Sequence, residues 1–331
     1  MKTRFAFAGF RHGHILDLLA GVEERPDTEV VACCEEDPGA RAELAAKGRV
    51  AITHTDFARM LDEVECDVVA IGDYYGRRGA LALAALGAGR HVLGDKPLFI
   101  TLDEQAAIEK IAAEKALLVG LQLDSRGYGA FRAVREIIRS GEIGEVCTIR
   151  IDGQHPLLPG TRPAWYFEPG KHGGTINDIG IHAFDLVPWL TGIDWKAVVA
   201  ARSWNQKARH APEFEDGAQV MAVLQNGAGV MADFSYVAPD RLGYQLPHYW
   251  HLLIHGSAGL LETHLFAKEV TVIKDSSEAP EVRPALENRP RGYLADFLNE
   301  LRGRKDLADL TSAHCLRASR LALEAQAAAK A

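Results

Sequence analysis

Residues 4–24, RFAFAGFRHGHILDLLAGVEE, decide the fold of the first half of this chain. Residues 4–8 are a strand candidate, a turn follows at Gly9, and residues 14–24 have the apolar spacing of a helix. A strand, a glycine turn and a helix begin a βαβ unit, and the first amides of such a helix can bind a pyrophosphate. The full GxGxxG spacing is absent, because Arg11 and His14 stand two and five positions after Gly9. This segment alone supports a dinucleotide-binding turn and an ordinary glycine turn about equally.

The same alternation of strands and helices continues over the first 120 or so residues. Strands are predicted at residues 4–8, 29–34, 50–53, 67–71, 91–93 and 117–121, and helices at residues 14–24, 37–46, 57–63, 78–88 and 102–115. Short apolar strands that alternate with helices predict a doubly wound parallel sheet with helices on both faces.

From about residue 125 the strands are longer and come in sequence pairs. Strands are predicted at residues 146–152, 197–204, 219–224, 229–236, 250–255, 259–264 and 269–274, and helices at residues 130–140, 293–302 and 312–329. The pair Asn226-Gly227 is a strong hairpin signal, and the whole pattern predicts an α+β domain with a large, open, mostly antiparallel sheet. The polar, proline-bearing segment 275–291 is predicted to be a mobile loop. We expect domains at residues 1–124 and 125–331, and the option that the C-terminal helices pack back on the first domain stays open.

Composition and charge narrow the class of protein. Of the 331 residues, 47% are hydrophobic and 25% charged, which is the balance of a globular protein and excludes disorder and a coiled-coil rod. The net charge of −8, without a long basic run, argues against nucleic acid or an anionic membrane as the main partner. The five cysteines form no CxxC, and no apolar run is long enough to span a bilayer, so a cytoplasmic location is expected.

Two groups at predicted strand ends are candidate ligand contacts. Glu35 follows the second strand, where a carboxylate can accept hydrogen bonds from a ribose 2′-hydroxyl and repel a 2′-phosphate, which predicts NAD over NADP. Because Glu36 and Asp37 follow it, a solvated acidic loop is the alternative. Lys96 lies after the fifth strand, where ligands of parallel sheets bind, although most lysines in turns are simply solvated.

The stretch at residues 173–185, GGTINDIGIHAFD, has the highest density of chemistry-bearing side chains. If the chain is helical from Asn177, Asp178 and His182 are four apart and share a helix face. A histidine beside carboxylates can accept or donate a proton near neutral pH. The alternative is a helix start with favourably placed acids and a core histidine, and Asp185 fits that structural role.

Metal binding is not expected from the sequence pattern. His251 and His255 form an HxxxH pair, but in a strand they would stand about 13 Å apart, which is too far for one ion. HExxH and grouped Cys/His patterns are absent from the sequence, so we predict no metal site.

In this order, the motifs resemble the Gfo/Idh/MocA family, the glucose–fructose oxidoreductase and inositol dehydrogenase group. The glycine turn, the strand-end acid, AGRHVLGDKP at residues 88–97, SGEIGEV at 140–146 and GGTINDIGIHAFDL at 173–186 look like family landmarks and span nearly the whole chain. The resemblance implies an N-terminal Rossmann domain, a C-terminal α+β domain whose open sheet mediates a homodimer or homotetramer, and NAD(P)-dependent chemistry on a sugar, cyclitol or related polyol. The family lysine corresponds to Lys96, next to Asp95 in place of a glutamate. The family aspartate and histidine correspond to Asp178 and His182.

The chain also departs from the family pattern. Two of the three Rossmann glycines are missing, and residues 73–78, DYYGRR, replace a proline-asparagine and a histidine that lie beside the nicotinamide in the family. The expected coenzyme contacts are Gly9, Phe10, Arg11, His12, Gly13, Glu35, Asp73, Tyr74, Asp95 and Lys96. The expected substrate contacts are Lys96, His155, Trp165, Asn177, Asp178 and His182. For Trp165, packing in the core is an equally supported role.

The resemblance implies a mechanism with Lys96, Asp178 and His182 as catalytic residues. His182 takes the hydroxyl proton of the substrate while hydride leaves for nicotinamide, Lys96 favours the developing alkoxide, and Asp178 orients the lysine or the substrate. Two alternatives remain: a redox-neutral lyase or glycosidase that uses NAD transiently, and a nucleotide-binding sensor without turnover.

Overall fold

A computed structural model describes residues 2–246 and 249–330. The chain divides into two compact units. The first unit comprises residues 1–122, 163–173 and 293–316, and the second comprises residues 123–162, 174–292 and 317–331. Each unit is built on one sheet, with five strands in the first and eight in the second among the residues described.

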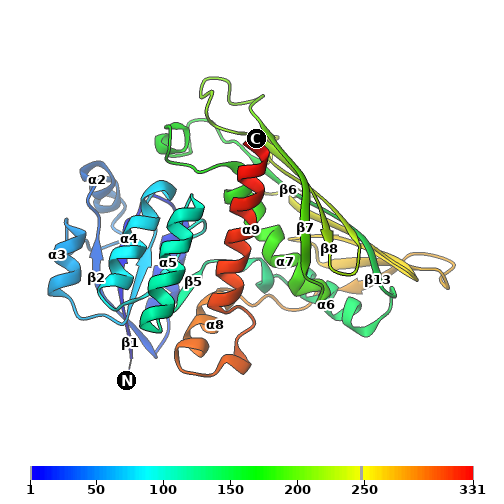
Figure 1. The fold of residues 1–331 in the computed structure, drawn as a ribbon, viewed down its shortest axis with the longest axis horizontal. Helices are drawn as coiled ribbons and strands as arrows, with labels where there is room; N and C mark the ends of the chain where they lie inside the picture. The colour runs from blue at the N-terminus through cyan, green and yellow to red at the C-terminus, as the bar shows by residue number, and fades with distance from the viewer. Residues whose placement is uncertain (1, 247–248, 331) are drawn as a thin grey trace. The chain divides into compact units, whose positions relative to one another are not determined.

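The first unit holds a fully parallel sheet in the order β2-β1-β3-β4-β5. Its strands are β1 (Thr3–Ala8), β2 (Thr28–Cys34), β3 (Val68–Ile71), β4 (His91–Gly94) and β5 (Val119–Leu121). The helices between them are α1 (His14–Glu23), α2 (Pro38–Lys47), α3 (Phe57–Glu63), α4 (Tyr75–Gly87) and α5 (Leu102–Lys115). α1 packs against β2, and α4 packs against β3 and β4. α4 lies beside α5 (Figure 1). β3 and β5 are apolar and buried along their whole length, and β1, β2 and β4 are apolar and buried toward their carboxyl ends, as the sequence pattern predicted.

One predicted strand of this unit is wrong. Residues 50–53 form no strand, and only an isolated bridge joins Cys34 to His54 at the end of β2. The amides of Thr53 (2.9 Å) and His54 (3.1 Å) both donate to the same carbonyl of Cys33. A ladder needs successive partners along the strand, and these contacts involve only residues 53 and 54, so they make one bridge and no strand.

The second unit holds a larger sheet in the order β13-β12-β11-β10-β6-β9-β8-β7. Its strands are β6 (Val146–Pro156), β7 (Trp195–Trp204), β8 (Gly217–Leu224), β9 (Gly229–Ala238), β10 (Tyr249–Gly256), β11 (Gly259–His264), β12 (Glu269–Lys274) and β13 (Glu281–Pro284). All neighbours pair antiparallel except β6 and β9, which are parallel. The open, mostly antiparallel sheet predicted for this part of the chain is therefore confirmed.

For two details of this sheet, one prediction from the sequence is confirmed and the other is wrong. The hairpin between β8 and β9 turns at Gly227, which has a φ of 92°, as the Asn-Gly pair predicted. The segment 275–291, predicted to be a mobile loop, instead contains β13. This strand pairs antiparallel with β12, so that Val270 of β12 lies opposite Arg283 of β13. The residues of β13 are alternately half-buried and exposed, so the segment lacks the apolar pattern by which a strand is identified in the sequence.

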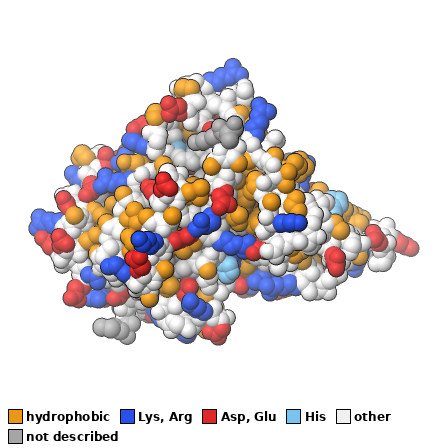
Figure 2. Space-filling view, in the orientation of Figure 1, with side chains coloured by type: hydrophobic (Ala, Val, Ile, Leu, Met, Phe, Trp, Pro, Cys, Tyr) orange, Lys and Arg blue, Asp and Glu red, His pale blue; other side chains and the backbone are white. Residues whose placement is uncertain are grey.

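The two faces of the second sheet differ. α6 (Gly129–Ser140) packs against β11 and β12, and α7 (Ile181–Thr191) packs against α6. Met221 and Met231 are 47% and 65% exposed, because they alternate with buried residues on β8 and β9 and point away from the core, and Val199 on β7 is 57% exposed. On the side of the molecule that Figure 2 shows, apolar side chains are mixed with charges of both signs.

The remaining described elements are short helices and the C-terminal helices. They are η1 (Asp124–Gly127), η2 (Ala164–Phe167), the π-turn η3 (Ile176–Gly180), η4 (Asp240–Leu242), η5 (Lys305–Leu307), α8 (Gly292–Leu301) and α9 (Ser312–Lys330). Among the described residues, we find no helix with both the length and the apolar character needed to cross a membrane.

Candidate functional site

The turn after β1 has the backbone geometry that a close phosphate requires. Gly9 has a φ of 78°, and a Cβ built on it would lie 2.6 Å from Cβ of Asp73 and 2.7 Å from its backbone nitrogen. Both the positive φ and the close approach of the backbone at Asp73 therefore require glycine at this position. Gly13 precedes α1 and has no side chain that could cap the first amides of the helix. The turn thus fits a pyrophosphate although the glycine pattern is incomplete.

The acid predicted to bind ribose has a structural task. Glu35 is 1% exposed, and its two carboxylate oxygens accept from the amides of Phe10 (2.7 Å) and Asp37 (2.9 Å). It therefore ties the glycine turn to the start of α2. Its contact with a ribose stays a prediction.

Arg11 and Tyr74, both predicted coenzyme contacts, lie close together. The Arg11 guanidinium is 5.9 Å from the centroid of the Tyr74 ring, and its Nη1 is 3.3 Å from Oδ2 of Asp37. Nζ of Lys171 lies 4.9 Å from the same ring. Two cations thus contact Tyr74 beside the glycine turn.

Asp73 follows β3 and packs against the glycine turn. It is 6% exposed, and burial raises its pKa to about 6, with a further upward contribution from Glu35. The amide of Tyr74 donates to its Oδ1 at 2.7 Å and partly offsets this shift by favouring the charged form. Asp73 therefore changes charge within the range of ordinary assay conditions.

Arg78 holds the backbone on both sides of Lys96. Its side chain is fully buried, and its Nη1 donates to the carbonyls of Asp95 (3.1 Å) and Pro97 (2.9 Å). Nη2 donates to the Asp95 carboxylate at 2.8 Å, and Nε donates to the carbonyl of Asp73 at 2.6 Å. Lys96 itself is 5% exposed at the carboxyl end of β4. One guanidinium therefore fixes the loops that follow β3 and β4.

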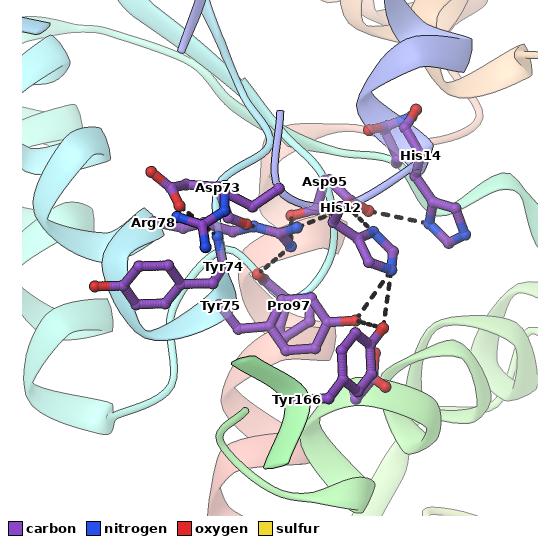
Figure 3. A network of polar contacts seen from close by, with 12 residues as sticks. His12, His14, Asp73, Tyr74, Tyr75, Arg78, Asp95, Pro97 and Tyr166 are labelled. Atoms are coloured by element: carbon purple, nitrogen blue, oxygen red, sulfur yellow. Dashed lines mark hydrogen bonds and ion pairs between the residues drawn. The ribbon is translucent and has the colours of Figure 1, made fainter. Parts of the chain in front are cut away.

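Asp95 is the centre of a polar network in the first unit (Figure 3). Its Oδ2 is 2.5 Å from Nδ1 of His12, and its Oδ1 is 3.2 Å from Nδ1 of His14. Nε2 of His12 is 2.9 Å from the hydroxyl of Tyr166 and 3.4 Å from that of Tyr75. The two tyrosine hydroxyls are 2.7 Å apart.

The charges of this network follow from its burial. Burial lowers the pKa of His12 to about 4, although the Asp95 carboxylate opposes this shift. Burial alone would raise the pKa of Asp95, but Arg78, His12 and His14 together hold it well below its usual range. The network therefore contains an ionised carboxylate, a guanidinium and a neutral His12 near neutral pH.

In the second unit, Asp178 lies in the π-turn η3 and is 3% exposed. The hydroxyl of Tyr236, on β9, donates to Oδ2 of Asp178. The π-turn runs into α7, so the helix predicted from Asn177 begins as a wider turn. π-turns occur often at functional sites, which agrees with a role for Asp178.

His182 lies in the first turn of α7. Its Nδ1 is 3.2 Å from the hydroxyl of Ser125, and its ring centroid is 5.4 Å from that of Trp250. Asp185 pairs with Arg126 through two contacts of 2.9 and 2.5 Å, which gives it the structural role considered from the sequence. The carboxylate of Asp185 is thus ion-paired with Arg126, although it lies near His182 in sequence.

The predicted substrate contacts are distributed over both units. In the second unit, Asn177 is buried in η3, and the His155 ring on β6 lies 5.0 Å from the Tyr249 ring. Trp165 belongs to the first unit, where its indole donates to the carbonyl of Arg11 at 3.1 Å. It is 2% exposed and packs 4.3 Å from Tyr166, so its core role is evident. Lys96 lies in the first unit and Asp178 and His182 in the second.

Two residues of the two networks were missed from the sequence. Arg78 stood only in the departing segment 73–78, and Tyr236 had no motif around it. An arginine one turn into an alanine-rich, buried helix was the one available signal, since such a residue needs several acceptors.

Comparisons with known proteins match both halves of the chain. Residues 4–123 match the model of an oxidoreductase family with an NAD-binding Rossmann fold, and residues 131–262 match a GFO/IDH/MocA C-terminal domain. An inositol 2-dehydrogenase of Leifsonia xyli is 30% identical over 66% of this chain and 61% of its own length. A 1,5-anhydro-D-fructose reductase of Ensifer adhaerens is 28% identical over 62% of this chain and 61% of its own length. The chain thus matches about three-fifths of each of these curated relatives.

The solved structures agree over nearly the full chain. An oxidoreductase from Erwinia carotovora atroseptica superposes with a TM-score of 0.87 at 26% identity, covering 99% of both chains. An inositol dehydrogenase homolog from Azotobacter vinelandii, solved with NAD⁺, has a TM-score of 0.80 at 18% identity and covers 100% of this chain and 96% of its own. The second likeness concerns the fold alone.

Proposed function

Because this chain belongs to the GFO/IDH/MocA oxidoreductase family, with an NAD-binding Rossmann domain, we propose that it interconverts a hydroxyl and a carbonyl on a sugar, cyclitol or related polyol. The observation that carries this proposal is the buried Lys96 at the carboxyl end of β4, the sheet edge at which ligands of such domains bind. The relatives named as acting on inositol, anhydrofructose and levoglucosan support the substrate class.

The coenzyme is proposed to lie on the glycine turn. The amides at the start of α1 would receive the pyrophosphate, and Gly9 lets the backbone approach it closely. Bound there, NAD supplies the hydride acceptor or donor. NAD is favoured over NADP because Glu35 stands at the end of β2, where a carboxylate would repel a 2′-phosphate, while the neighbouring Glu36 and Asp37 are paired with Arg77 and Arg11.

Three side chains are proposed to handle the substrate oxygen and its proton. The ammonium of Lys96 would donate to the oxygen on which negative charge develops. His182 would take the hydroxyl proton during oxidation and return it during reduction, with Ser125 orienting its ring through Nδ1. Asp178, fixed by the Tyr236 hydroxyl, would orient the substrate.

The proposal is tested with NAD⁺ and a panel of cyclitols and sugars. Wild type should form NADH and oxidised product in equal amounts with at least one member. Lys96→Met and His182→Ala should each lower turnover by about 10²–10⁴-fold while calorimetry shows unchanged NAD⁺ binding. Lys110→Met and His210→Ala, both at exposed positions, are the matched controls. Undiminished turnover in K96M and H182A would refute the assignment, product without NADH would favour the redox-neutral alternative, and NAD⁺ binding without any product would favour a sensor.

The assembly and location are proposed on separate grounds. A homodimer or homotetramer through the second sheet is supported by Val199, Met221 and Met231, which are exposed on strands β7, β8 and β9. Met231→Lys should shift the chain to a smaller species in sedimentation, and an unchanged mass would reject this interface. A reducing, cytoplasmic location is supported by five cysteines that form no disulfide. Cell fractionation tests it.

A further inference from the structure

Three potential metal ligands meet at the carboxyl edge of the first sheet. His12 and His14 follow β1, Asp95 follows β4, and one ligand atom from each lies within 4.8 Å of the others. Both histidines direct Nδ1 at the Asp95 carboxylate, but at different oxygens, with separations of 2.5 and 3.2 Å (Figure 3). The rings stand edge to face, with centroids 4.4 Å apart. Two imidazoles and one carboxylate therefore converge from two strand ends.

Each of the two buried ligands, His12 and Asp95, is also held by a hydrogen bond to a side chain that is not itself a ligand. The Nε2 of His12 lies 2.9 Å from the Tyr166 hydroxyl, whose oxygen can accept a hydrogen bond from the Nε2–H of an imidazole that binds a metal through Nδ1. Arg78 donates to Oδ2 of Asp95 at 2.8 Å and fixes the plane of the carboxylate. Outer partners of this kind hold metal ligands in position and select the histidine tautomer.

The site is closed on one side and open on the other. Asp95 is fully buried, the His12 side chain is 12% exposed, and the His14 side chain is 56% exposed. Three protein ligands with one accessible side are typical of sites that keep a position for water or a substrate oxygen. The sheet edge on which they lie is where ligands of parallel sheets bind.

We propose that His12, His14 and Asp95 bind a divalent transition-metal ion and leave one position open to an oxygen ligand. A set of two nitrogens and one oxygen favours Zn²⁺ or Co²⁺ over Mg²⁺ and Ca²⁺, which prefer oxygen alone. Zinc bonds of about 2.0–2.2 Å place tetrahedral ligand atoms about 3.3 Å apart. The separation to His14 already fits this distance, and the contact to His12 must lengthen by less than about 1 Å.

The charge of Arg78 sets a limit on this site. Its guanidinium neutralises the carboxylate, so the site offers less negative charge than one with an unpaired aspartate, and its affinity is reduced accordingly. The alternative is that Asp95 serves only as a hydrogen-bond acceptor for Arg78 and the two histidines. The sequence-based expectation of no metal considered histidines of the second half of the chain and did not include this group.

Equilibrium dialysis of the full, tag-free chain against Zn²⁺, Co²⁺ and Mg²⁺ separates these options. Wild type should bind one Zn²⁺ or Co²⁺ per chain, and Mg²⁺ at least about 10-fold more weakly. His14→Ala should lose more affinity than the outer-partner variant Tyr166→Phe, for which a loss of about 10–100-fold is expected. His210→Ala and Tyr244→Phe, both exposed and in the second unit, are the matched controls and should bind as wild type does.

His14→Ala carries the test because it leaves the buried Arg78–Asp95 pair intact, and circular dichroism should confirm an unchanged fold. Zn²⁺ affinity that is equal in wild type, H14A and the controls would overturn the proposal, as would a wild type that binds no Zn²⁺ or Co²⁺. The measurement uses neither coenzyme nor polyol, so a negative result leaves the proposed oxidoreductase function untouched.

Discussion

Replacing Arg78 by methionine should destabilise the first unit far more than an ordinary arginine substitution. Arg78 and Asp95 are both fully buried, and their ion pair measures 2.8 Å. Methionine fills much of the same volume but leaves the Asp95 carboxylate without its guanidinium. Breaking a buried pair in this way costs about 3–5 kcal/mol, because the remaining charge is unsolvated and keeps only its contacts with His12 and His14. The two carbonyls that flank Lys96 lose their donor as well.

The assay is urea unfolding, with the change in free energy taken from the midpoint and slope. The matched control is Arg59→Met, because Arg59 is 72% exposed and pairs with Glu63 at 2.7 Å one helical turn away. That exposed pair should contribute little to stability, because water screens both charges. A double variant, R78M with Asp95→Asn, should be more stable than the sum of the single changes predicts, since the unpaired charge is removed. If R78M unfolds within about 1 kcal/mol of R59M, the buried pair does not hold this region and the reasoning fails.

Three further changes test other parts of the structure. The raised pKa of Asp73, about 6 against an ordinary 3.8, disfavours its charged form in the fold, so the associated stability is present at low pH and is lost as pH rises through 6. Asp73→Asn should therefore be more stable than wild type by up to about 3 kcal/mol above pH 6, and an advantage that does not shrink toward pH 4 in melting experiments would contradict this. Gly9→Ala should weaken NAD⁺ binding at least about 10-fold in calorimetry, because the left-handed backbone costs about 1–2 kcal/mol and the Cβ meets Asp73. Gly87→Ala, where an added Cβ meets nothing within 4 Å, should bind as wild type does. Tyr236→Phe should lower turnover about 10-fold or more, since a hydrogen bond to charged Asp178 is worth about 1.5–3 kcal/mol, and unchanged kcat would reject that role.

The fold was predictable where local signals and long-range pairing agree. The apolar strands β1 and β3 and the Asn226-Gly227 hairpin have patterns with one reasonable structural outcome, and the structure contains all of them. Residues 50–53 have a similar local pattern, but beside β2 only an isolated bridge between Cys34 and His54 forms. For β13 the reverse holds: its sequence is polar and predicts no strand, but it forms one because it pairs with β12.

The sites were less predictable because they depend on contacts between distant segments. Glu35 stood at the expected strand end, yet two backbone amides occupy its oxygens, and those amides belong to turns whose geometry a sequence does not specify. His12 and Asp95 are 83 residues apart and follow strands separated by β3, so their contact required the sheet order. Tyr166 reaches His12 from a segment that lies between two parts of the second unit in sequence.

The central claim, hydride exchange between a polyol carbon and NAD, is tested most directly by following deuterium. Wild type is incubated with NAD⁺ and perdeuterated myo-inositol or glucose, and the masses of coenzyme and product are measured. We predict one deuterium on the NADH formed and a product that has lost one carbon-bound deuterium. Product that forms while the released coenzyme carries no deuterium, or bound NAD⁺ that gains none with any member of the panel, would contradict the account.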